Sequence, residues 1–342
     1  MSAPLFRVDQ GALNHRRLSL CSTPQAARRS VVGAGLMLGL LATAGAGADQ
    51  RLLAKLEAGR FILEITTEDG RISRWFTDSG GGLFVTAEAV ERLSLETVEV
   101  DESEGKKARY AALPRSSGAA IPPPRENEGR LYVFAQEPGK GGPFAESFDG
   151  MLGQAWHAGR RLVFDYPAGT LTELAPESPL PAAAASLPLG FKSDDEGARQ
   201  LDFPRLSATV EGEPIELLFD TGATVTLTDT ALEALGGGPR ERATSFVVAT
   251  RFDAWRAAHP QWRALEAAEA GTGSAMLEVP AVAFAGVTVG PVWFTRRPDT
   301  NFHDYMSQWM DQKVDGALGG NAFANLRLTV DYPGARLYVE TP

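Results

Sequence analysis

The sequence predicts a mainly β protein whose body consists of two related lobes. A three-residue motif, Asp-(Ser/Thr)-Gly, occurs twice, at 78–80 and at 220–222. A second block, Asp-Gly-apolar-Leu-Gly, follows each copy, at 149–153 and at 315–319. Short runs of β-branched and aromatic residues fill both halves and are separated by glycine and proline, which is typical of short strands joined by turns. Two blocks repeated in the same order indicate a duplicated unit.

Composition excludes several classes of function. The 342 residues are 44% hydrophobic and 22% charged, which is ordinary for a globular protein with one large or two medium domains. The net charge of −10 disfavours nucleic acid as a partner, because phosphates require cationic side chains. A single cysteine excludes a disulfide scaffold and thiolate metal sites. The four histidines lie far apart in the sequence, so we expect no metal and no cofactor.

Residues 1–48 have the pattern of a signal peptide or an N-terminal anchor. Two arginines, Arg28 and Arg29, precede an apolar run at 31–44, and small residues follow it at 44–48. The run is shorter than the roughly 20 residues that span a bilayer. We therefore expect an exported protein, periplasmic or secreted, with no membrane contact beyond a possible anchor. Without the leader the chain has 28 basic and 42 acidic residues and no cysteine, which suits export.

Aligning the two short motifs places Asp78 over Asp220. The other pairs at this offset include Phe61 with Phe203, Gly70 with Gly212, and Thr86 with Thr228. Each of these threonines is expected to begin a short helix. The second block aligns at a larger offset, so the second copy contains extra residues between its two blocks. Aromatic residues in this extra segment follow helical spacing, and Pro260 is expected to break the helix into two pieces with one packed face.

The repeat also defines the expected domains. One lobe is placed at about 49–176 and the other at about 200–342. The stretch between them, 177–199, is rich in proline, alanine and charged residues and is expected to be a linker.

The two acidic turns are the candidates for chemistry. An apolar strand leads directly into Asp220, and a carboxylate in such a place needs a partner or a task because its burial is costly. Gly80 and Gly222 allow the backbone to turn closely beneath the acids. Ser79 and Thr221 can form hydrogen bonds to a facing loop and hold it rigid.

On these residues the sequence resembles the aspartic proteases, both the pepsin-like two-lobed kind and the retropepsin-like kind. The resemblance covers nearly all of residues 60–342. It rests on the two Asp-(Ser/Thr)-Gly motifs, on the apolar-apolar-Gly triplets at 151–153 and 317–319, and on the strands after them. It implies a bilobal, pepsin-like pseudo-dimer of two acid-protease β-barrel lobes. A cleft between the lobes would bind an extended peptide or protein substrate.

The same resemblance implies an aspartic endopeptidase, a hydrolase that needs no metal or cofactor. The implied residues are the catalytic Asp78 and Asp220, with Ser79, Gly80, Thr221 and Gly222 supporting their loops. Two adjacent carboxyl groups cannot both ionise cheaply, so such a pair holds one proton over a working pH range. The ionised group takes a proton from a water molecule, and the protonated group polarises the peptide carbonyl.

Two departures from the family pattern leave alternatives open. Thr77 precedes Asp78 where the family usually has an apolar residue, and Gly81 follows the motif where alanine, serine or threonine is commoner. One alternative is an exported, catalytically inactive, protease-like protein that binds peptides. Another is a retropepsin-like homodimer that uses only Asp220. We expect a monomer rather than a homodimer.

The remaining repeated acids have structural interpretations. Asp149 and Asp315 are expected to be turn acids, and Asp165 and Asp331 to be strand-end hydrogen-bond acceptors. A flap over the cleft has candidates at 271–274 and at 116–118, the latter with Tyr110 as a polar tip. A plain hairpin turn is the favoured interpretation of both.

Overall fold

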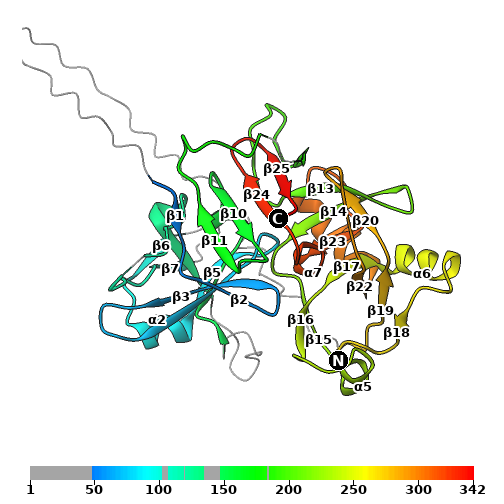
Figure 1. Cartoon of the computed structure of the whole chain (residues 1–342). Helices are drawn as coiled ribbons and strands as arrows, with labels where there is room; N and C mark the ends of the chain where they lie inside the picture. Colours follow the sequence, from blue (N-terminus) through cyan, green and yellow to red (C-terminus); the bar gives the residue numbers. More distant parts are fainter. Residues whose placement is uncertain (1–47, 102–106, 119, 135–146, 183–184) are drawn as a thin grey trace, which may run out of the picture.

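The computed structural model describes residues 48–101, 107–118, 120–134, 147–182 and 185–342. The expected leader, apart from its last residue, lies outside this described part. Strands outnumber helices among the described residues and form three large sheets and a small one, so the mainly β prediction is confirmed (Figure 1). No helix in these ranges is long and apolar enough to cross a membrane.

The first lobe, as far as it is described, is built on an eight-stranded sheet in the order β2-β3-β4-β9-β5-β8-β7-β6. Its strands are β2 (Ala54–Glu57), β3 (Arg60–Thr66), β4 (Ile72–Thr77), β5 (Leu83–Thr86), β6 (Thr97–Asp101), β7 (Lys107–Ala112), β8 (Arg130–Phe134) and β9 (Gly150–Leu152). Helix α2 (Ala87–Leu93) follows β5, and Thr86 begins it as expected by accepting the N–H of Ala89. The shorter helices are the 3-10 helix η2 (Asn127–Gly129) and α4 (Gln154–His157).

Side chains alternate between the two faces of this sheet. On β3, Phe61, Leu63 and Ile65 point into the main hydrophobic core. Ile62 belongs instead to a separate cluster with Phe76 of β4. Because successive residues of a strand face opposite sides, the sheet separates its core face from a second apolar face.

The second lobe is built on a nine-stranded sheet, within the described residues, in the order β18-β19-β22-β17-β23-β14-β13-β20-β21. Its strands are β13 (Arg205–Val210), β14 (Glu213–Asp220), β17 (Ser245–Val248), β18 (Ala264–Leu265), β19 (Met276–Val279), β20 (Val282–Phe284), β21 (Val287–Val289), β22 (Val292–Arg297) and β23 (Gly316–Gly319). A small separate sheet pairs β15 (Thr224–Thr226) with β16 (Glu241–Ala243). The helices are α5 (Asp229–Ala234), α6 (Ala249–Ala258), the π-helix η3 (Thr300–Met306), the 3-10 helix η4 (Ser307–Trp309) and α7 (Gly320–Phe323).

The aromatic segment of the second lobe forms one helix rather than two. Phe252 and Trp255 are buried on α6, so the packed face is confirmed. The helix ends before Pro260, and the chain beyond it turns into the short strand β18. The predicted second helical piece is therefore wrong, because proline stops the helix and the next residues pair with β19.

A six-stranded sheet joins the two halves of the chain (Figure 1). Its order is β1 (Gln50–Arg51), β11 (Thr170–Glu173), β10 (Arg161–Asp165), β24 (Arg327–Asp331), β25 (Arg336–Glu340) and β12 (Ala185–Pro188). At its centre Val163 of β10 lies opposite Thr329 of β24, which is its counterpart in the repeat. An approximate two-fold axis therefore passes between these two strands. The stretch expected to be a linker contains β12, which pairs with β25 at the edge of this sheet.

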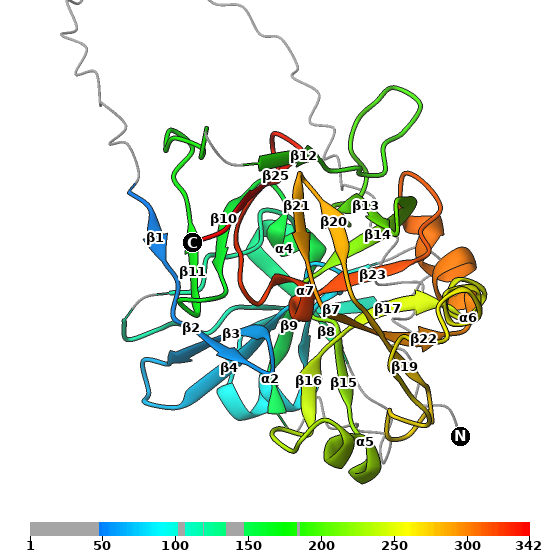
Figure 2. The same ribbon diagram turned by 45° about the vertical axis from the view of Figure 1, so that its right-hand side comes forward.

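The strand pairings show which parts of the halves are equivalent. In the first lobe β9 lies between β4 and β5, parallel to β4 and antiparallel to β5. In the second lobe β23 lies in the same way between β14 and β17. Hence β17, and not β15, is the counterpart of β5. Most of the extra length, β15, α5 and β16, is inserted directly after Asp220-Thr221-Gly222, at one end of the lobe (Figure 2).

This insertion corrects the alignment of Thr86 with Thr228. Thr228 does begin a helix, because its hydroxyl accepts the N–H of Ala231. That helix is α5, however, which belongs to the insertion. The residue equivalent to Thr86 is Val248, at the end of β17.

Candidate active site

The two Asp-(Ser/Thr)-Gly turns meet face to face and are locked together by reciprocal hydrogen bonds. The Ser79 N–H donates to Thr221 Oγ1 over 3.1 Å, and the Thr221 N–H donates to Ser79 Oγ over 3.0 Å. Ser79 Oγ in turn donates to the Phe219 carbonyl over 2.7 Å. Both side chains are fully buried. These bonds fix two loops from different sheets relative to each other with near two-fold symmetry.

Asp78 and Asp220 lie close to each other beside these bonds, because each carboxyl group packs against the glycine of the opposite motif and the charge of Asp220 acts on Asp78. Each carboxylate is also oriented by its own loop, because Asp78 Oδ1 accepts the Gly80 N–H and Asp220 Oδ1 accepts the Gly222 N–H, both at 2.9 Å. Asp220 is 9% exposed and Asp78 is partly exposed. The structure therefore brings both predicted aspartates into one site within a single chain.

The surroundings of the pair favour a shared proton. Burial raises the pKa of both carboxyl groups, and at Asp78 the charge of Asp220 raises the pKa further. At Asp220 the Gly222 N–H, the Asp78 carboxyl group and the Ala223 N–H lower the pKa and so oppose the effect of burial. Two carboxyl groups in such contact lose their protons in two separate steps. Between those steps the pair carries one proton and one negative charge.

The glycines of the motifs are required by close packing against the opposite acid. A Cβ atom on Gly222 would lie 2.3 Å from Asp78 Cγ. A Cβ atom on Gly80 would lie 3.0 Å from Asp220 Cγ. Each glycine thus makes room for the carboxyl group of the other lobe.

Packing also accounts for the two departures in the first motif. Gly81 cannot be replaced easily, because its Cβ atom would lie 2.7 Å from Asp78 Oδ2 and 2.4 Å from Met151 Sδ. Thr77 is fully buried, but its hydroxyl donates to the Phe61 carbonyl over 2.6 Å, so its polar group is satisfied. Neither departure disturbs the arrangement of the acids.

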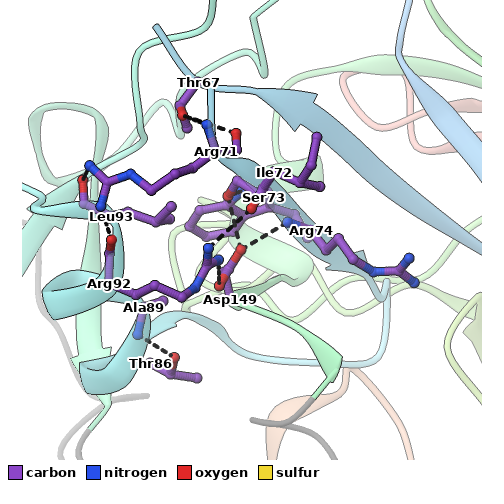
Figure 3. Close-up of polar contacts among 11 residues, drawn as sticks. Thr67, Arg71, Ile72, Ser73, Arg74, Thr86, Ala89, Arg92, Leu93 and Asp149 are labelled. Atoms are coloured by element: carbon purple, nitrogen blue, oxygen red, sulfur yellow. Dashed lines mark hydrogen bonds and ion pairs between the residues drawn. The ribbon is translucent and has the colours of Figure 1, made fainter. Parts of the chain in front are cut away.

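Asp149 connects strands of the first lobe at the opposite end of β4 from Asp78 (Figure 3). Asp149 accepts hydrogen bonds from Ser73 Oγ at 3.0 Å and from the Arg74 N–H at 2.9 Å, and its other oxygen pairs with Arg92 at 2.5 Å. These contacts hold the start of β9 against β4 and α2, as expected of a structural acid.

The other repeated acids have similar roles. Asp315 pairs with His303 and Arg251. Asp165 and Asp331 accept turn N–H groups, and each also faces an arginine of the other half across the central sheet.

The flap candidates are turns held in place by their neighbours. Residues 271–274 join β18 to β19 as a hairpin, in which the Gly273 N–H donates to the Glu269 carbonyl over 3.0 Å. The Ser117 N–H donates to the Thr66 carbonyl, which ties the other candidate to the end of β3. Tyr110 is only 6% exposed, so its predicted role as a polar tip is wrong. Its ring packs edge-on against Tyr132 within the sheet.

One buried cation near the pair was not predicted from the sequence. Arg60 is 6% exposed and lies close enough to Asp78 to lower the pKa of that carboxyl group, opposing the effect of burial. Strand register places it there, since Arg60 and Asp78 are at matching ends of neighbouring strands, and the sequence pattern alone does not give that register. Among the described residues, no group of three or more His, Cys, Asp or Glu side chains could hold a metal ion.

Comparison with known proteins gives similarities of fold only. No family model and no curated protein matches the chain. One similar solved structure is conglutin gamma, a basic 7S globulin from lupine seeds, with a TM-score of 0.46, 9% identity, and coverage of 86% of this chain and 95% of that one. Another is an aspartic proteinase from Irpex lacteus, with a TM-score of 0.47, 10% identity, and coverage of 86% and 97%. Neither similarity bears on the activity of this chain.

Proposed function

We propose that this protein is an aspartic endopeptidase with a pepsin-like two-lobed fold, acting through Asp78 and Asp220. The observation that carries the proposal is the close pair of carboxyl groups, supplied by two equivalent loops of one chain that reciprocal hydrogen bonds hold together. A pair of carboxyl groups whose pKa values are both raised is costly to keep, and its common use is general acid–base chemistry.

The reaction follows from the shared proton. The ionised carboxylate accepts a proton from a water molecule held between the two acids, and the water oxygen forms a bond to the peptide carbonyl carbon. The protonated carboxyl group donates a hydrogen bond to the carbonyl oxygen and stabilises the charge that develops there. A proton then passes to the peptide nitrogen, the C–N bond breaks, and a carboxylic acid and an amine are released.

The proposed substrate is an extended peptide or an unfolded protein, and the test uses one. The purified chain is incubated with a denatured protein between pH 3 and pH 7, and products are identified by mass spectrometry. We expect internal cleavages that are suppressed by inhibitors of the pepstatin type. Binding of peptides without products at any pH would contradict the proposal and support the inactive binding protein instead.

We also propose that the protein acts as a monomer and is exported. Support for the monomer is the presence of both acids in one chain, since a homodimer built on Asp220 alone would leave Asp78 without a task. Support for export is the sequence of residues 1–48, and N-terminal sequencing of protein from fractionated cells tests it.

The raised pKa values predict a trade-off between activity and stability. A carboxyl group whose pKa is higher in the folded state stabilises the fold below its ordinary value of 3.8, and this contribution is lost as the pH rises through the folded-state pKa. Asp220→Asn removes the ionised form, so we expect a free energy of unfolding about 1 kcal/mol or more above wild type at pH 7. The gain should vanish near pH 3.

Urea denaturation at the two pH values measures this difference, with Asp195→Asn, at an exposed position, as the control. A variant that is less stable than wild type at pH 7 would show that the pair is not under electrostatic strain.

A further inference from the structure

Arg60 stands opposite Asp78 on the same face of the first sheet. Strands β3 and β4 pair with Ile62 opposite Phe76, so the register two residues further on places Arg60 opposite Asp78. The Arg60 guanidinium lies over the ring of Phe76 at 5.2 Å and over that of Phe148 at 5.7 Å. These stacking contacts hold a nearly fully buried positive charge beside one acid of the pair.

The same guanidinium reaches the second lobe. Arg60 Nη2 forms an ion pair with Glu241 at 2.9 Å, and Nη1 donates to Thr224 Oγ1 at 3.5 Å. Both partners belong to the β15–β16 insertion, which follows the second motif. The Glu241 side chain is 50% exposed, so water screens part of its charge. The buried Nε of Arg60 has no hydrogen-bond partner in the described part of the chain.

The second lobe has no such cation at the equivalent position. Strands β13 and β14 pair with Arg205 opposite Leu218, so the same extension places Phe203 opposite Asp220. Phe203 is buried in the apolar cluster that contains Leu218. The approximate two-fold symmetry is therefore broken beside the acids, with a guanidinium next to one carboxyl group and a phenyl ring next to the other.

We propose that Arg60 is a positioning residue that moves the pH range in which the Asp78–Asp220 pair is singly ionised to lower pH, and that Glu241 limits the size of this shift. The inference rests on the proposed function and adds which residues set the pH range of the proposed reaction. A buried positive charge favours each deprotonation of the pair. It therefore opposes the rise in pKa that burial of the two acids causes. The pairing with Glu241 partly neutralises that charge from the solvent side.

Other charged and titratable groups around the pair do not substitute for Arg60. Burial raises the pKa of Tyr166 beside Asp220 and of Tyr332 beside Asp78, so both phenols stay neutral in the working range. Arg199 and Asp202, near Tyr332, pair with each other at 3.1 Å. On β4, Arg74 is paired with Glu57 and Glu64 of its own lobe.

The test is the pH dependence of kcat/KM in variants on either side of the ion pair. Arg60→Gln removes the positive charge, and we expect both limbs of the pH profile to move upward by about one pH unit. Glu241→Gln keeps Arg60 and removes its neutralising partner, so both limbs should move downward, by about half a unit. Arg60→Lys keeps the charge and should leave the limbs close to their wild-type positions.

A merely structural contact cannot move the limbs of the pH profile in opposite directions in the two Gln variants. If the ion pair only joined the lobes, both Gln substitutions would lower activity at every pH without moving the limbs, and that result would overturn the proposal. Glu241→Gln changes a half-exposed residue, so it remains informative even if Arg60→Gln does not fold.

A second readout separates this inference from the proposed function. The carboxyl groups of the pair can be titrated by ¹³C NMR on the full chain without any substrate. Opposite shifts of their apparent pKa values in the two Gln variants, in a protein that cleaves nothing, would support the role of Arg60 and contradict the peptidase. If both Gln variants of an active enzyme had unchanged apparent pKa values, the role of Arg60 would be contradicted and the peptidase would be supported.

Discussion

Replacing either Asp78 or Asp220 with asparagine is expected to lower kcat/KM at least about a thousandfold. Asparagine can still accept the N–H of the neighbouring glycine, so the loop geometry is kept. It cannot take a proton from water or share one with the remaining acid. Cleavage of a denatured protein by each purified variant, followed by mass spectrometry, measures the loss, with Asp195→Asn as the control that keeps full activity.

This experiment also distinguishes one chain from two. In a homodimer that uses only Asp220, Asp78→Asn would keep wild-type activity. In the single-chain site both variants are inactive and stay inactive when mixed, because each chain lacks one acid of its own pair. Recovery of cleavage on mixing would contradict the monomeric site.

Gly222→Ala is expected to lower activity at least about a hundredfold and to destabilise the fold by about 1–3 kcal/mol. The added Cβ atom would lie 2.3 Å from Asp78 Cγ and 2.6 Å from both of its oxygens. Reciprocal hydrogen bonds between Ser79 and Thr221 hold the two loops, so neither can move away without breaking them. The carboxyl group of Asp78 must therefore be displaced from its partner.

Gly118→Ala provides the matched control, because Gly118 is exposed and a Cβ atom there meets no atom within 4 Å. Activity and urea denaturation of the two variants are compared under the same conditions. A Gly222→Ala protein with wild-type kcat/KM would show that the close approach of the two loops is not needed for catalysis.

The paired acids could be predicted from the sequence because each motif is local. An apolar strand, an aspartate and a glycine form the same turn wherever they occur, and the repeat indicates that two such turns belong together. Asp78 and Asp220 accordingly lie close together, each against the glycine of the opposite motif. The mainly β character followed from the same short runs of strand-forming residues.

Strand register could not be predicted, and it decided which residues surround the acids. The alignment matched Phe61 with Phe203, but the structure places Arg60 in the position equivalent to Phe203. The reason is that residues 67–71 join β3 to β4, whereas only 211–212 join β13 to β14. A shift by one residue moves a side chain to the other face of a sheet. Phe61 therefore lies in the main core, Phe203 in the second cluster, and Arg60 beside Asp78.

The pairing of strands that are far apart in the sequence could not be predicted either. The six-stranded sheet takes strands from both halves of the chain, including β12 from the stretch expected to be a linker. Its alanines and prolines indicate a linker when considered alone, and only β25 supplies the partner that makes 185–188 a strand. In the same way, Thr228 begins a helix of the insertion, which local capping chemistry cannot distinguish from a helix of the repeat.

The most direct test of a two-aspartate site within one chain is a titration of that site with an inhibitor. Peptide analogues are made from sequences that the protein is found to cleave, with a secondary alcohol replacing the scissile carbonyl, and their binding is measured by calorimetry at the pH of highest activity. We expect one inhibitor bound per monomeric chain, and loss of tight binding in both Asp78→Asn and Asp220→Asn. One inhibitor per two chains, or tight binding that survives loss of Asp78, would contradict such a site.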